Sequence, residues 1–484
     1  MDTSKTESLL MDAIKQVAPK EHFGLLFSGG IDSLMLAFYL KKLGYNFTCY
    51  TASLKNNKEL EYTKEVAKSL NLNLKHKIIE TKEIPKYLKK IIPELKQTNP
   101  INVAVALTTY IASELARKDK VNIVFSGLGA DEIFGGYSRH KESKNLNKDL
   151  KEGLDKVYND DLKRDQIMAS LNNLEIKAPF LEKKLVEYAI KLPKEYKIKD
   201  GINKFVLRNL ALKNKIKEEY ALKPKKAAQY SSKFDKAIEK LAKKQKLPKS
   251  RYLNQYFNLG ILFSSGKDSC YATHLMKKEN YTIKCLITIK SKNPDSYMYH
   301  TPNIDLTKIQ AKAMSLPIIF QETTGKKEAE LKELEIVLKK AKEKYNLQGI
   351  VTGALFSDYQ RERIEKIADK LSLKVFSPLW HKDQEIEMRE LIDNKFKFIF
   401  TSIAADGLDK SWLNKIITNK EIDKLVDLNK KIGLNIAGEG GEFESLVLDC
   451  PLFNKKLKIL EIETIEEDKN TAKIIIKKAE LDTK

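Results

Sequence analysis

The sequence predicts an α/β protein built from two tandem, doubly wound parallel-sheet domains, and three observations support this fold class. Apolar runs with the length of strands alternate with helical patterns along both halves, as in parallel sheets covered by helices on both faces. The same strand–turn–helix pattern occurs twice, at Leu25–Ser33 and at Ile261–Ser269, 236 residues apart. A chain of 484 residues is also long enough for two domains, each with its own core.

The predicted domains are residues 1–247 and 258–484, joined by a linker at 248–257. The segment from Lys240 to Asn254 is basic, contains Pro248 and lacks apolar periodicity, which is typical of a linker. In the first domain we expect a helix over 9–17, strands at 47–51, 73–79 and 122–125, and helices at 58–70 and 101–118. In the second we expect strands at 283–289, 318–320, 349–351 and 397–403, with helices at 326–345 and 357–371.

Cysteine usage and hydropathy favour a protein of a reducing compartment. The four cysteines, at positions 49, 270, 285 and 450, have neither close pairing nor the spacing of a zinc site. No segment approaches the continuous apolar length of a membrane span, and the N-terminal residues Met1–Lys5 lack the apolar core of a signal peptide. We therefore expect a soluble, cytoplasmic protein without a membrane partner.

The formal net charge of +22 has two interpretations. Basic surfaces bind phosphate backbones, which would suggest a nucleic-acid partner. The 88 basic residues are nearly all lysines, however, and they are spread through every predicted helix without a dense block. A lysine-rich composition on solvated helix faces is the simpler interpretation, so direct nucleic-acid binding is not expected.

The repeated turn has the chemistry of a phosphate-binding loop. A turn between a buried strand and a helix N-terminus presents unpaired backbone N–H groups and the positive end of the helix dipole. It is not the usual mononucleotide loop, because Lys267 is followed by Asp268 rather than by Ser or Thr. The turn instead resembles the SGGxDS signature of the PP-loop ATP pyrophosphatases, which bind the β- and γ-phosphates of ATP while the bond between the α- and β-phosphates breaks. This resemblance implies that ATP is bound by Ser28, Gly29, Gly30, Asp32 and Ser33 in the first domain and by Ser264, Ser265, Gly266 and Ser269 in the second.

A second glycine-rich loop, Ser126–Tyr137, follows a predicted strand of the first half. Gly127 and Gly129 allow close backbone approach, and Asp131 is a carboxylate suited to Mg²⁺ on ATP phosphates. Together with the first turn, this loop resembles the SGEGSDELFGGY pattern of the synthetase domain of asparagine synthetases. The stretches 164–169, 178–182 and 204–208 agree with that family. The resemblance implies nucleotide binding by Gly127, Asp131 and Lys225, and Mg²⁺ binding by Asp32 and Asp131.

Two departures from the asparagine synthetase pattern limit what it implies. Leu128 replaces the glutamate that serves the ammonia step in the family, so a proton acceptor is missing there. Asp2 stands where a glutaminase domain would carry its cysteine. The first half is similar to the divergent asparagine synthetase domain-containing group. An adenylating activity, such as asparagine synthesis, and an accessory role in nucleotide binding or substrate docking both stay open.

Motifs of the second half resemble one family. Gly438–Asp449 packs three glutamates and an aspartate around three glycines, and Thr352–Arg363 follows a predicted strand. With Ser377–Gln384, these motifs are similar to the diphthine–ammonia ligase family across nearly all of the second half. The resemblance implies that ATP activates the carboxylate of diphthine, a modified histidine of translation elongation factor 2. Ammonia then gives diphthamide, with AMP and pyrophosphate as the other products.

The residue types present suit this reaction. A carboxylate becomes an acyl donor once it is adenylated, and the departing pyrophosphate needs N–H groups and Mg²⁺ for stabilisation. Lys267 and Asp268 are therefore expected to be catalytic, with Asp268 on the metal side. Arg363 or Arg361 is expected to neutralise the adenylate or the substrate carboxylate. The candidates to bind ammonium and accept its proton are Glu439, Glu442 and Glu444. The substrate-binding candidates are Asp358, Tyr359, Gln360 and Arg361.

A tRNA-modifying PP-loop enzyme, such as a thiolase or a lysidine synthetase, is the main alternative, because the net charge favours it. That class predicts a cysteine pair or an added RNA-binding module, and neither is apparent in the sequence. Cys270, in the first helical turn after the second loop, is interpreted as a small apolar residue. The sequence leaves open whether a homodimer forms and where the ammonia comes from.

Overall fold

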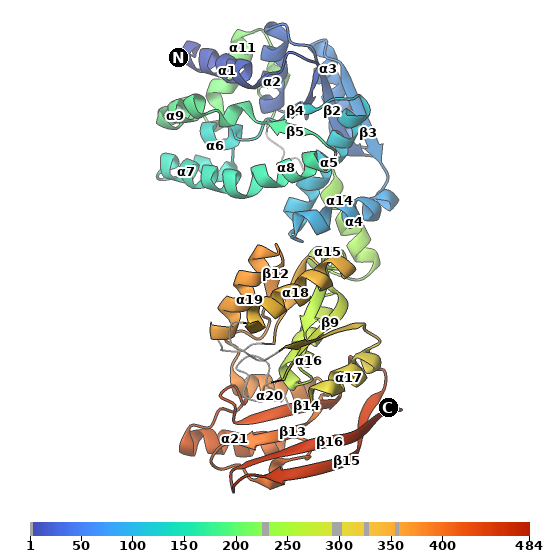
Figure 1. Ribbon diagram of the computed structural model, residues 1–484. Coiled ribbons are helices and arrows are strands. Elements are labelled where there is room, and N and C mark those ends of the chain that lie inside the picture. The colour runs from blue at the N-terminus through green and yellow to red at the C-terminus, as the bar shows by residue number, and fades with distance from the viewer. Residues whose placement is uncertain (1–2, 225–231, 293–302, 324–328, 354–357) are drawn as a thin grey trace. The chain divides into compact units, whose positions relative to one another are not determined.

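The computed structural model describes residues 3–224, 232–292, 303–323, 329–353 and 358–484 (Figure 1). The chain divides into two compact units, Met1–Leu253 and Asn254–Lys484. Each unit contains a five-stranded parallel sheet with helices packed on it, so the α/β fold class is confirmed. None of the helices in the described ranges has the length and apolar character needed to cross a bilayer.

The sheet of the first unit has the strand order β3-β2-β1-β4-β5, and its pairs are parallel. The strands are β1 (Phe23–Leu26), β2 (Phe47–Leu54), β3 (Leu74–Ile79), β4 (Ile123–Phe125) and β5 (Glu175–Lys177). The chain passes from β1 to β2 on one side and later returns to β4 on the other side. Ligands of open α/β sheets bind in the crevice at the carboxyl ends of two strands related in this way.

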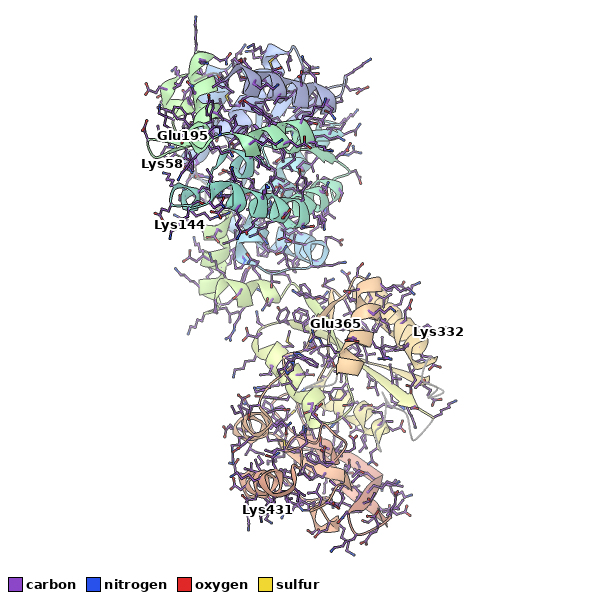
Figure 2. All side chains as sticks on the ribbon, turned by 90° about the vertical axis from the view of Figure 1, so that its left-hand side faces the viewer. Lys58, Lys144, Glu195, Lys332, Glu365 and Lys431 are labelled. Atoms are coloured by element: carbon purple, nitrogen blue, oxygen red, sulfur yellow. The ribbon has the colours of Figure 1, made fainter. Side chains whose placement is uncertain are left out.

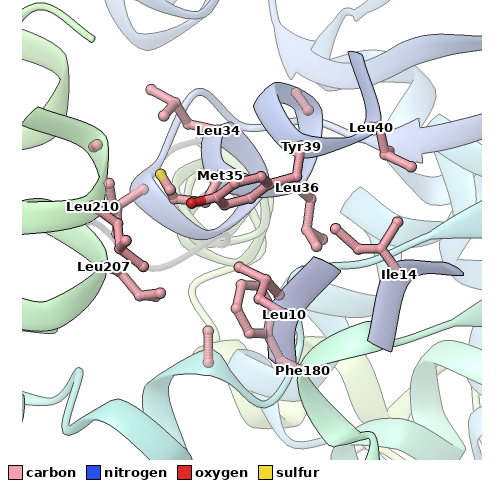
Figure 3. Close-up of a cluster of buried hydrophobic side chains, with 14 of the residues drawn as sticks. Leu10, Ile14, Leu34, Met35, Leu36, Tyr39, Leu40, Phe180, Leu207 and Leu210 are labelled. Atoms are coloured by element: carbon pink, nitrogen blue, oxygen red, sulfur yellow. The ribbon is translucent and has the colours of Figure 1, made fainter. Parts of the chain in front are cut away.

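The first turn is held in place by the helix that follows it. This helix, α2, is buried on nearly every side, and Leu34, Met35 and Leu36 are inaccessible to solvent. Figure 3 shows these side chains among those of Leu10 and Leu207, which belong to α1 and α11. The described helices of this unit are α1 (Ser4–Val17), α2 (Ile31–Lys42), α3 (Lys58–Ser69), α4 (Ile84–Leu95), α5 (Pro100–Lys118), α6 (Ala130–Phe134), α7 (Leu146–Lys156), α8 (Leu162–Ser170), α9 (Lys183–Lys191), α10 (Lys194–Lys197), α11 (Phe205–Lys213), α12 (Glu218–Ala221), α14 (Phe234–Lys244) and α15 (Lys249–Asn254), and a hairpin joins β6 (Ile198–Lys199) to β7 (Ile202–Asn203).

The segment around the predicted linker contains two helices, α14 and α15. Phe234 and Ile238 of α14 are buried, and so is Leu253 at the end of α15. The Nζ atom of Lys249 lies 2.6 Å from Oδ1 of Asp235, which ties α15 to α14. The many lysines of this segment occupy the exposed faces of short amphipathic helices, so the apolar pattern was too sparse to recognise in the sequence.

The second unit repeats the parallel sheet, with the strand order β10-β9-β8-β11-β12. The strands are β8 (Asn258–Leu262), β9 (Thr282–Ser291), β10 (Ile318–Thr323), β11 (Gly349–Val351) and β12 (Lys374–Phe376), and the helices around them are α16 (Lys267–Lys278), α17 (Thr307–Met314), α18 (Ala329–Tyr345) and α19 (Asp358–Lys370). Val337, Ile350 and Ala368 belong to a buried cluster that joins the sheet to α18 and α19. Strand β8 occupies the place of β1, so the second turn also lies where the strand order reverses.

A four-stranded antiparallel sheet completes the second unit, with the order β14-β13-β16-β15. Its strands are β13 (Lys397–Ala404), β14 (Phe443–Asp449), β15 (Lys456–Glu466) and β16 (Thr471–Asp482), and its helices are α20 (Gln384–Asp393) and α21 (Asn419–Ile432). The strand expected at 397–403 therefore forms, but it does not continue the parallel series. Phe398, Ile399 and Phe400 are buried in succession, a pattern that does not reveal whether the partner strands are parallel or antiparallel.

Lysines are distributed over the exposed surface of both units. Lys58 and Lys144 of the first unit and Lys332 and Lys431 of the second are exposed, and their side chains point away from the ribbon (Figure 2). These positions fit the interpretation that much of the positive charge lies on solvated helix faces.

Candidate active sites

Both turns are closed by their last serine. In the first turn, Ser33 Oγ accepts a hydrogen bond from the backbone N–H of Ser28 (3.2 Å) and donates one to the carbonyl of Gly30 (3.1 Å). In the second turn, Ser269 Oγ makes the equivalent two bonds at 3.3 and 3.2 Å. Ser33 and Ser269 were expected to bind phosphate, and the structure gives their hydroxyls a role in shaping the turn.

The second residue of each turn adopts a left-handed backbone conformation. Gly29 has a φ of 72° and Ser265 a φ of 75°, an angle that residues other than glycine rarely adopt. Ser265 is buried, and its carbonyl accepts hydrogen bonds from Gln310 Nε2 (3.1 Å) and from the backbone N–H of Val447 (3.2 Å). The surrounding structure therefore holds Ser265 in a strained conformation, which is typical of functional loops.

A glycine after the fourth strand of each parallel sheet lets a second loop approach the turn. A Cβ atom at Gly127 would lie 3.0 Å from Cβ of Asp32. A Cβ atom at Gly353 would lie 2.8 Å from the backbone carbonyl carbon of Asp268 and 2.8 Å from the nitrogen of Ser269. Gly127 was predicted as a site residue and Gly353 was not, although the two glycines follow equivalent strands of the internal repeat.

Two acidic residues of the first site share one buried lysine. The Nζ atom of Lys204 lies 2.6 Å from Asp32 and 2.7 Å from Asp131, and its side chain is 2% exposed. Burial opposes the charged form of Lys204, yet the carboxylates of Asp131 and Asp32 raise its pKa. The structure thus brings the two predicted metal ligands together and places an ammonium group between them.

A cavity of about 470 Å³ lies beside the first turn, within the size range of small-molecule sites. Its wall includes the turn, the loop that contains Leu128 and three arginines, Arg139, Arg164 and Arg208. Arg164 is paired with Asp165 at 2.9 Å, while Arg208 donates to the backbone carbonyl of Ala221 at 2.6 Å. Leu128 presents an apolar side chain where the asparagine synthetase pattern has a carboxylate. Lys225, the remaining predicted nucleotide ligand, lies outside the described residues.

The second site contains a buried ion cluster at the turn itself. The Nζ atom of Lys267 lies 2.5 Å from Oδ1 of Asp268 and 4.0 Å from Oε1 of Glu387 on α20. Burial opposes the charged form of Lys267, but Asp268 and Glu387 raise its pKa to about 12. Glu387 is fully buried, and burial raises its pKa well above the usual range of a glutamate. Glu387 was not predicted as a site residue, because it lies on an ordinary helix outside every motif recognised in the sequence.

The antiparallel sheet brings part of the glutamate-rich motif to the second turn. Ser445 Oγ on β14 accepts a hydrogen bond from the backbone N–H of Lys267 at 3.1 Å. The neighbouring Glu444 is partly exposed, and burial together with the Asp268 carboxylate raises its pKa to about 7, while Lys267 acts in the opposite direction. Glu439 also acts electrostatically on Lys267. Glu442 instead uses its carboxylate to accept a hydrogen bond from the N–H of Gly440 at 2.8 Å.

The predicted substrate residues lie on the first turns of α19. The guanidinium of Arg361 stacks on the ring of Trp380 at 4.6 Å, and its Nε donates to Oε1 of Glu365 at 2.7 Å. Arg361 is therefore engaged along the helix surface, and Arg363 is partly exposed. Asp358, Tyr359 and Gln360 belong to the same helix by their backbone, and their side chains, with residues 354–357 and 298–302, lie outside the described part of the structure.

The carboxylates at the two turns are the groups that could bind a metal ion. Within the described ranges, no group of three or more His, Cys, Asp or Glu side chains is arranged to hold a metal ion by itself. Magnesium does not need such a group of protein donors. It usually keeps several waters and binds through one or two carboxylates together with substrate phosphates. Asp268 in the second unit, and Asp32 with Asp131 in the first, have the carboxylates for this role.

The two units match different protein families. Residues 258–375 match the diphthamide synthase N-terminal domain, and residues 383–481 match the diphthamide synthase C-terminal domain. Residues 5–153 and 144–258 match asparagine synthase. The boundary between the two diphthamide synthase domains falls between β12 and α20, so the second site combines residues from both of them.

Individual relatives agree with these matches. A diphthine–ammonia ligase from Mus musculus is 36% identical over 226 residues, which cover 43% of this chain and 84% of that protein. A protein named as an asparagine synthetase in Methanocaldococcus jannaschii is 31% identical over 289 residues, and the match spans about half of each chain, 52% of this one and 53% of that one. A solved structure of a predicted tRNA methyltransferase subunit from Methanocaldococcus jannaschii matches 40% of this chain and 98% of its own at 18% identity, with a TM-score of 0.24, a similarity too low to bear on function.

Proposed function

The chain belongs to the diphthine–ammonia ligase family and carries an asparagine synthase domain in its first unit, and on this basis we propose that its second unit is an ATP-dependent amide ligase. Its substrate is diphthine on translation elongation factor 2, and its nitrogen donor is ammonia. The products are diphthamide, AMP and pyrophosphate. The protein then acts in the cytoplasm, where elongation factor 2 works.

One observation carries this proposal. Strand β14 is bonded to the second turn through Ser445, so Glu444 lies next to the residues that would hold the phosphates of ATP. Amide formation from an acid needs these two functions side by side, because the activated carboxyl group must stay bound while the amine loses a proton.

In the first step, a carboxylate oxygen of diphthine attacks the α-phosphorus of ATP. The bond from that phosphorus to the bridging oxygen breaks, and pyrophosphate leaves with the negative charge. The backbone N–H groups at the start of α16 and the ammonium of Lys267 favour this charge, because they are fixed in a poorly solvated turn before the reaction begins. Magnesium bound through Asp268 would neutralise further charge on the phosphates.

In the second step, ammonia attacks the acyl carbon of the adenylate. The bond to the AMP oxygen breaks, AMP leaves, and the new C–N bond carries an extra proton. Glu444 is placed to take that proton, since a carboxylate with a pKa of about 7 is well matched to general base work near neutral pH. Glu439 adds negative charge that favours a cationic ammonium in the same region.

Mass spectrometry of elongation factor 2 tests the proposal directly. Factor carrying diphthine is incubated with the full chain, ATP and ammonium, and the modified peptide is examined for conversion of the acid to the amide, with AMP measured in parallel. We expect one AMP for each amide, and we expect Asp268→Asn to abolish both products. Release of ADP instead of AMP, or an unchanged peptide in the presence of folded protein, would refute the assignment. Modification of tRNA by the same preparation would favour the alternative class.

The first unit is proposed to bind ATP at its own turn and to adenylate a small carboxylic acid. The observation that favours this second function is the cavity beside Ser28–Ser33, whose wall also contains Lys204 and Arg208. ATP–pyrophosphate exchange by the full chain, with aspartate and with other amino acids, tests it in the absence of elongation factor 2. Exchange that is lost on Ser28→Asp supports an active first site, whereas ATP binding without exchange supports an accessory one.

A further inference from the structure

Glu387 is a buried acid that the reaction described above does not use. Its side chain is 0% exposed, and among the described residues neither of its carboxyl oxygens has a hydrogen-bond donor. Burial and the neighbouring Asp268 carboxylate, which acts on it, raise the pKa of Glu387. Buried polar groups are nearly always hydrogen-bonded, so an exception calls for a specific reason. In this case the nearest cation is Lys267, whose Nζ atom lies 4.0 Å from Oε1 of Glu387, just beyond hydrogen-bond distance.

Helix α20 fixes Glu387 in this position. Asp383 caps the helix by accepting a hydrogen bond from the backbone N–H of Ile386 at 2.9 Å. The side chain of Gln384 accepts a hydrogen bond from the N–H of Ile436 at 2.9 Å, which ties the first turn of α20 to the segment that leads into the glutamate-rich motif. Met388 is fully buried beside Glu387. Glu387 is therefore held by the fold and not by its own polar contacts.

Lys267 consequently has two carboxyl groups within reach. Asp268, at 2.5 Å, binds the ammonium group in this structure. Glu387, on helix α20, lies 4.0 Å from the same group. A divalent cation on Asp268 would compete with Lys267 for the same negative charge, and the two cations would repel each other. A fully buried lysine that lost its counter-ion would be strongly disfavoured.

We propose that Glu387 is a positioning residue that takes over the ammonium group of Lys267 when Asp268 turns to the magnesium of bound ATP. The groups that act electrostatically on Glu387 are Lys267 and Asp268 at the turn and Glu439 in the glutamate-rich motif, and Lys267 is the cation among them. Without Glu387, Lys267 would stay on Asp268 and magnesium would bind less well. This inference rests on the proposed function of the second turn.

Magnesium-dependent ATP binding tests the inference, with calorimetry on the full chain as the readout. Every protein carries Ser28→Asp, because Ser28 is exposed and a carboxylate there repels phosphate from the first turn. Magnesium should increase the affinity for ATP, and the readout is the magnesium concentration at the midpoint of this increase. We expect Glu387→Gln to raise that midpoint by about tenfold. The affinity for metal-free ATP should stay within about twofold of the parent value. Asp393→Asn is the matched control, since Asp393 is an exposed acid of the same helix.

A double-mutant cycle separates positioning from a general structural effect. In a chain that carries Lys267→Gln, adding Glu387→Gln should cause no further loss of magnesium dependence, because the ammonium group that Glu387 receives is gone. An equal loss in both backgrounds, or an unchanged magnesium requirement in Glu387→Gln alone, would overturn the inference. Thermal unfolding confirms that each variant is folded, and Glu387→Asp, which keeps the carboxyl group, should shift the requirement less than Glu387→Gln does.

The outcomes also distinguish this inference from the proposed function. A parent chain that binds magnesium and ATP at the second turn but does not amidate elongation factor 2 refutes the function and leaves the Glu387 test valid. A parent chain that binds no magnesium with ATP refutes both.

Discussion

The hydroxyl of Ser445 accepts a hydrogen bond from the backbone N–H of Lys267 at 3.1 Å, across 178 positions of sequence. The backbone N–H of Val447 donates a second hydrogen bond, to the carbonyl of Ser265, at 3.2 Å. These two bonds join the antiparallel sheet to the turn of the parallel sheet. The acidic side of the second site and the side proposed to bind phosphate therefore come from different sheets, and neither sheet alone contains a complete site.

Replacement of Ser445 by alanine tests this joint. The N–H of Lys267 would remain buried without an acceptor, so we expect Ser445→Ala to lower the free energy of unfolding of the second unit by about 1–3 kcal/mol. Urea unfolding followed by circular dichroism measures the change. Ser411→Ala, at an exposed serine of the same unit, should leave the urea midpoint unchanged. Equal midpoints for both variants would show that the bond contributes nothing.

Gly353 is expected to tolerate no side chain. A Cβ atom there would lie 2.8 Å from backbone atoms of Asp268 and Ser269, which cannot move without opening the turn. We expect Gly353→Ala to cost about 1–3 kcal/mol of stability and to weaken nucleotide binding at the second turn. Gly153→Ala is the control, because a Cβ at that helical glycine makes an ordinary 3.4 Å contact and alanine favours helix. Stability equal to that of the parent chain would contradict the close approach inferred at Gly353.

Replacement of Lys204 in the first site should destabilise the first unit, because Asp32 and Asp131 then repel each other. Lys204→Met leaves Asp32 and Asp131 without their shared cation, and we expect a loss of about 3–5 kcal/mol from the first unit. Magnesium should then raise the unfolding temperature of the variant more than that of the parent chain, because a cation can replace the ammonium group. Lys191→Met, at an exposed lysine, serves as the control in the same thermal unfolding series. A magnesium response identical to that of the parent chain would argue against a metal site at this acid pair.

The stability of the second unit should depend on pH through Glu444. Its pKa is raised from 4.5 to about 7, so the folded state binds this proton more tightly than the unfolded state does. The resulting stabilisation is complete below about pH 4.5 and is lost as the pH rises through about 7. We therefore expect Glu444→Gln to become more stable relative to the parent chain between about pH 5 and about pH 8, in metal-free buffer. Glu442→Gln controls for loss of a carboxylate from the same motif, and a pH-independent difference for Glu444→Gln would contradict the raised pKa.

The internal repeat shows how far prediction from sequence extended. Both turns were predicted with the correct flanking strands, because an apolar strand, a small-residue turn and a helix start are all encoded within about ten residues. Gly353 could have been predicted in the same way, because it follows its strand as Gly127 follows the equivalent strand. The helices around the predicted linker, α14 and α15, were not predicted, because lysine-rich amphipathic helices have too few apolar positions to be recognised in a sequence.

What the sequence determined by itself was local: the alternation of strands and helices, the two strand–turn–helix motifs, and the presence of glutamates in a motif shared with one family. Only the tertiary structure decided that β13 pairs in an antiparallel sheet, that Lys204 bridges Asp32 and Asp131, and that Glu387 faces Lys267. Those relationships join residues far apart in the chain, and they depend on how whole sheets and helices pack. No local pattern of residues specifies such packing, whereas the conformation of a turn follows from its immediate neighbours.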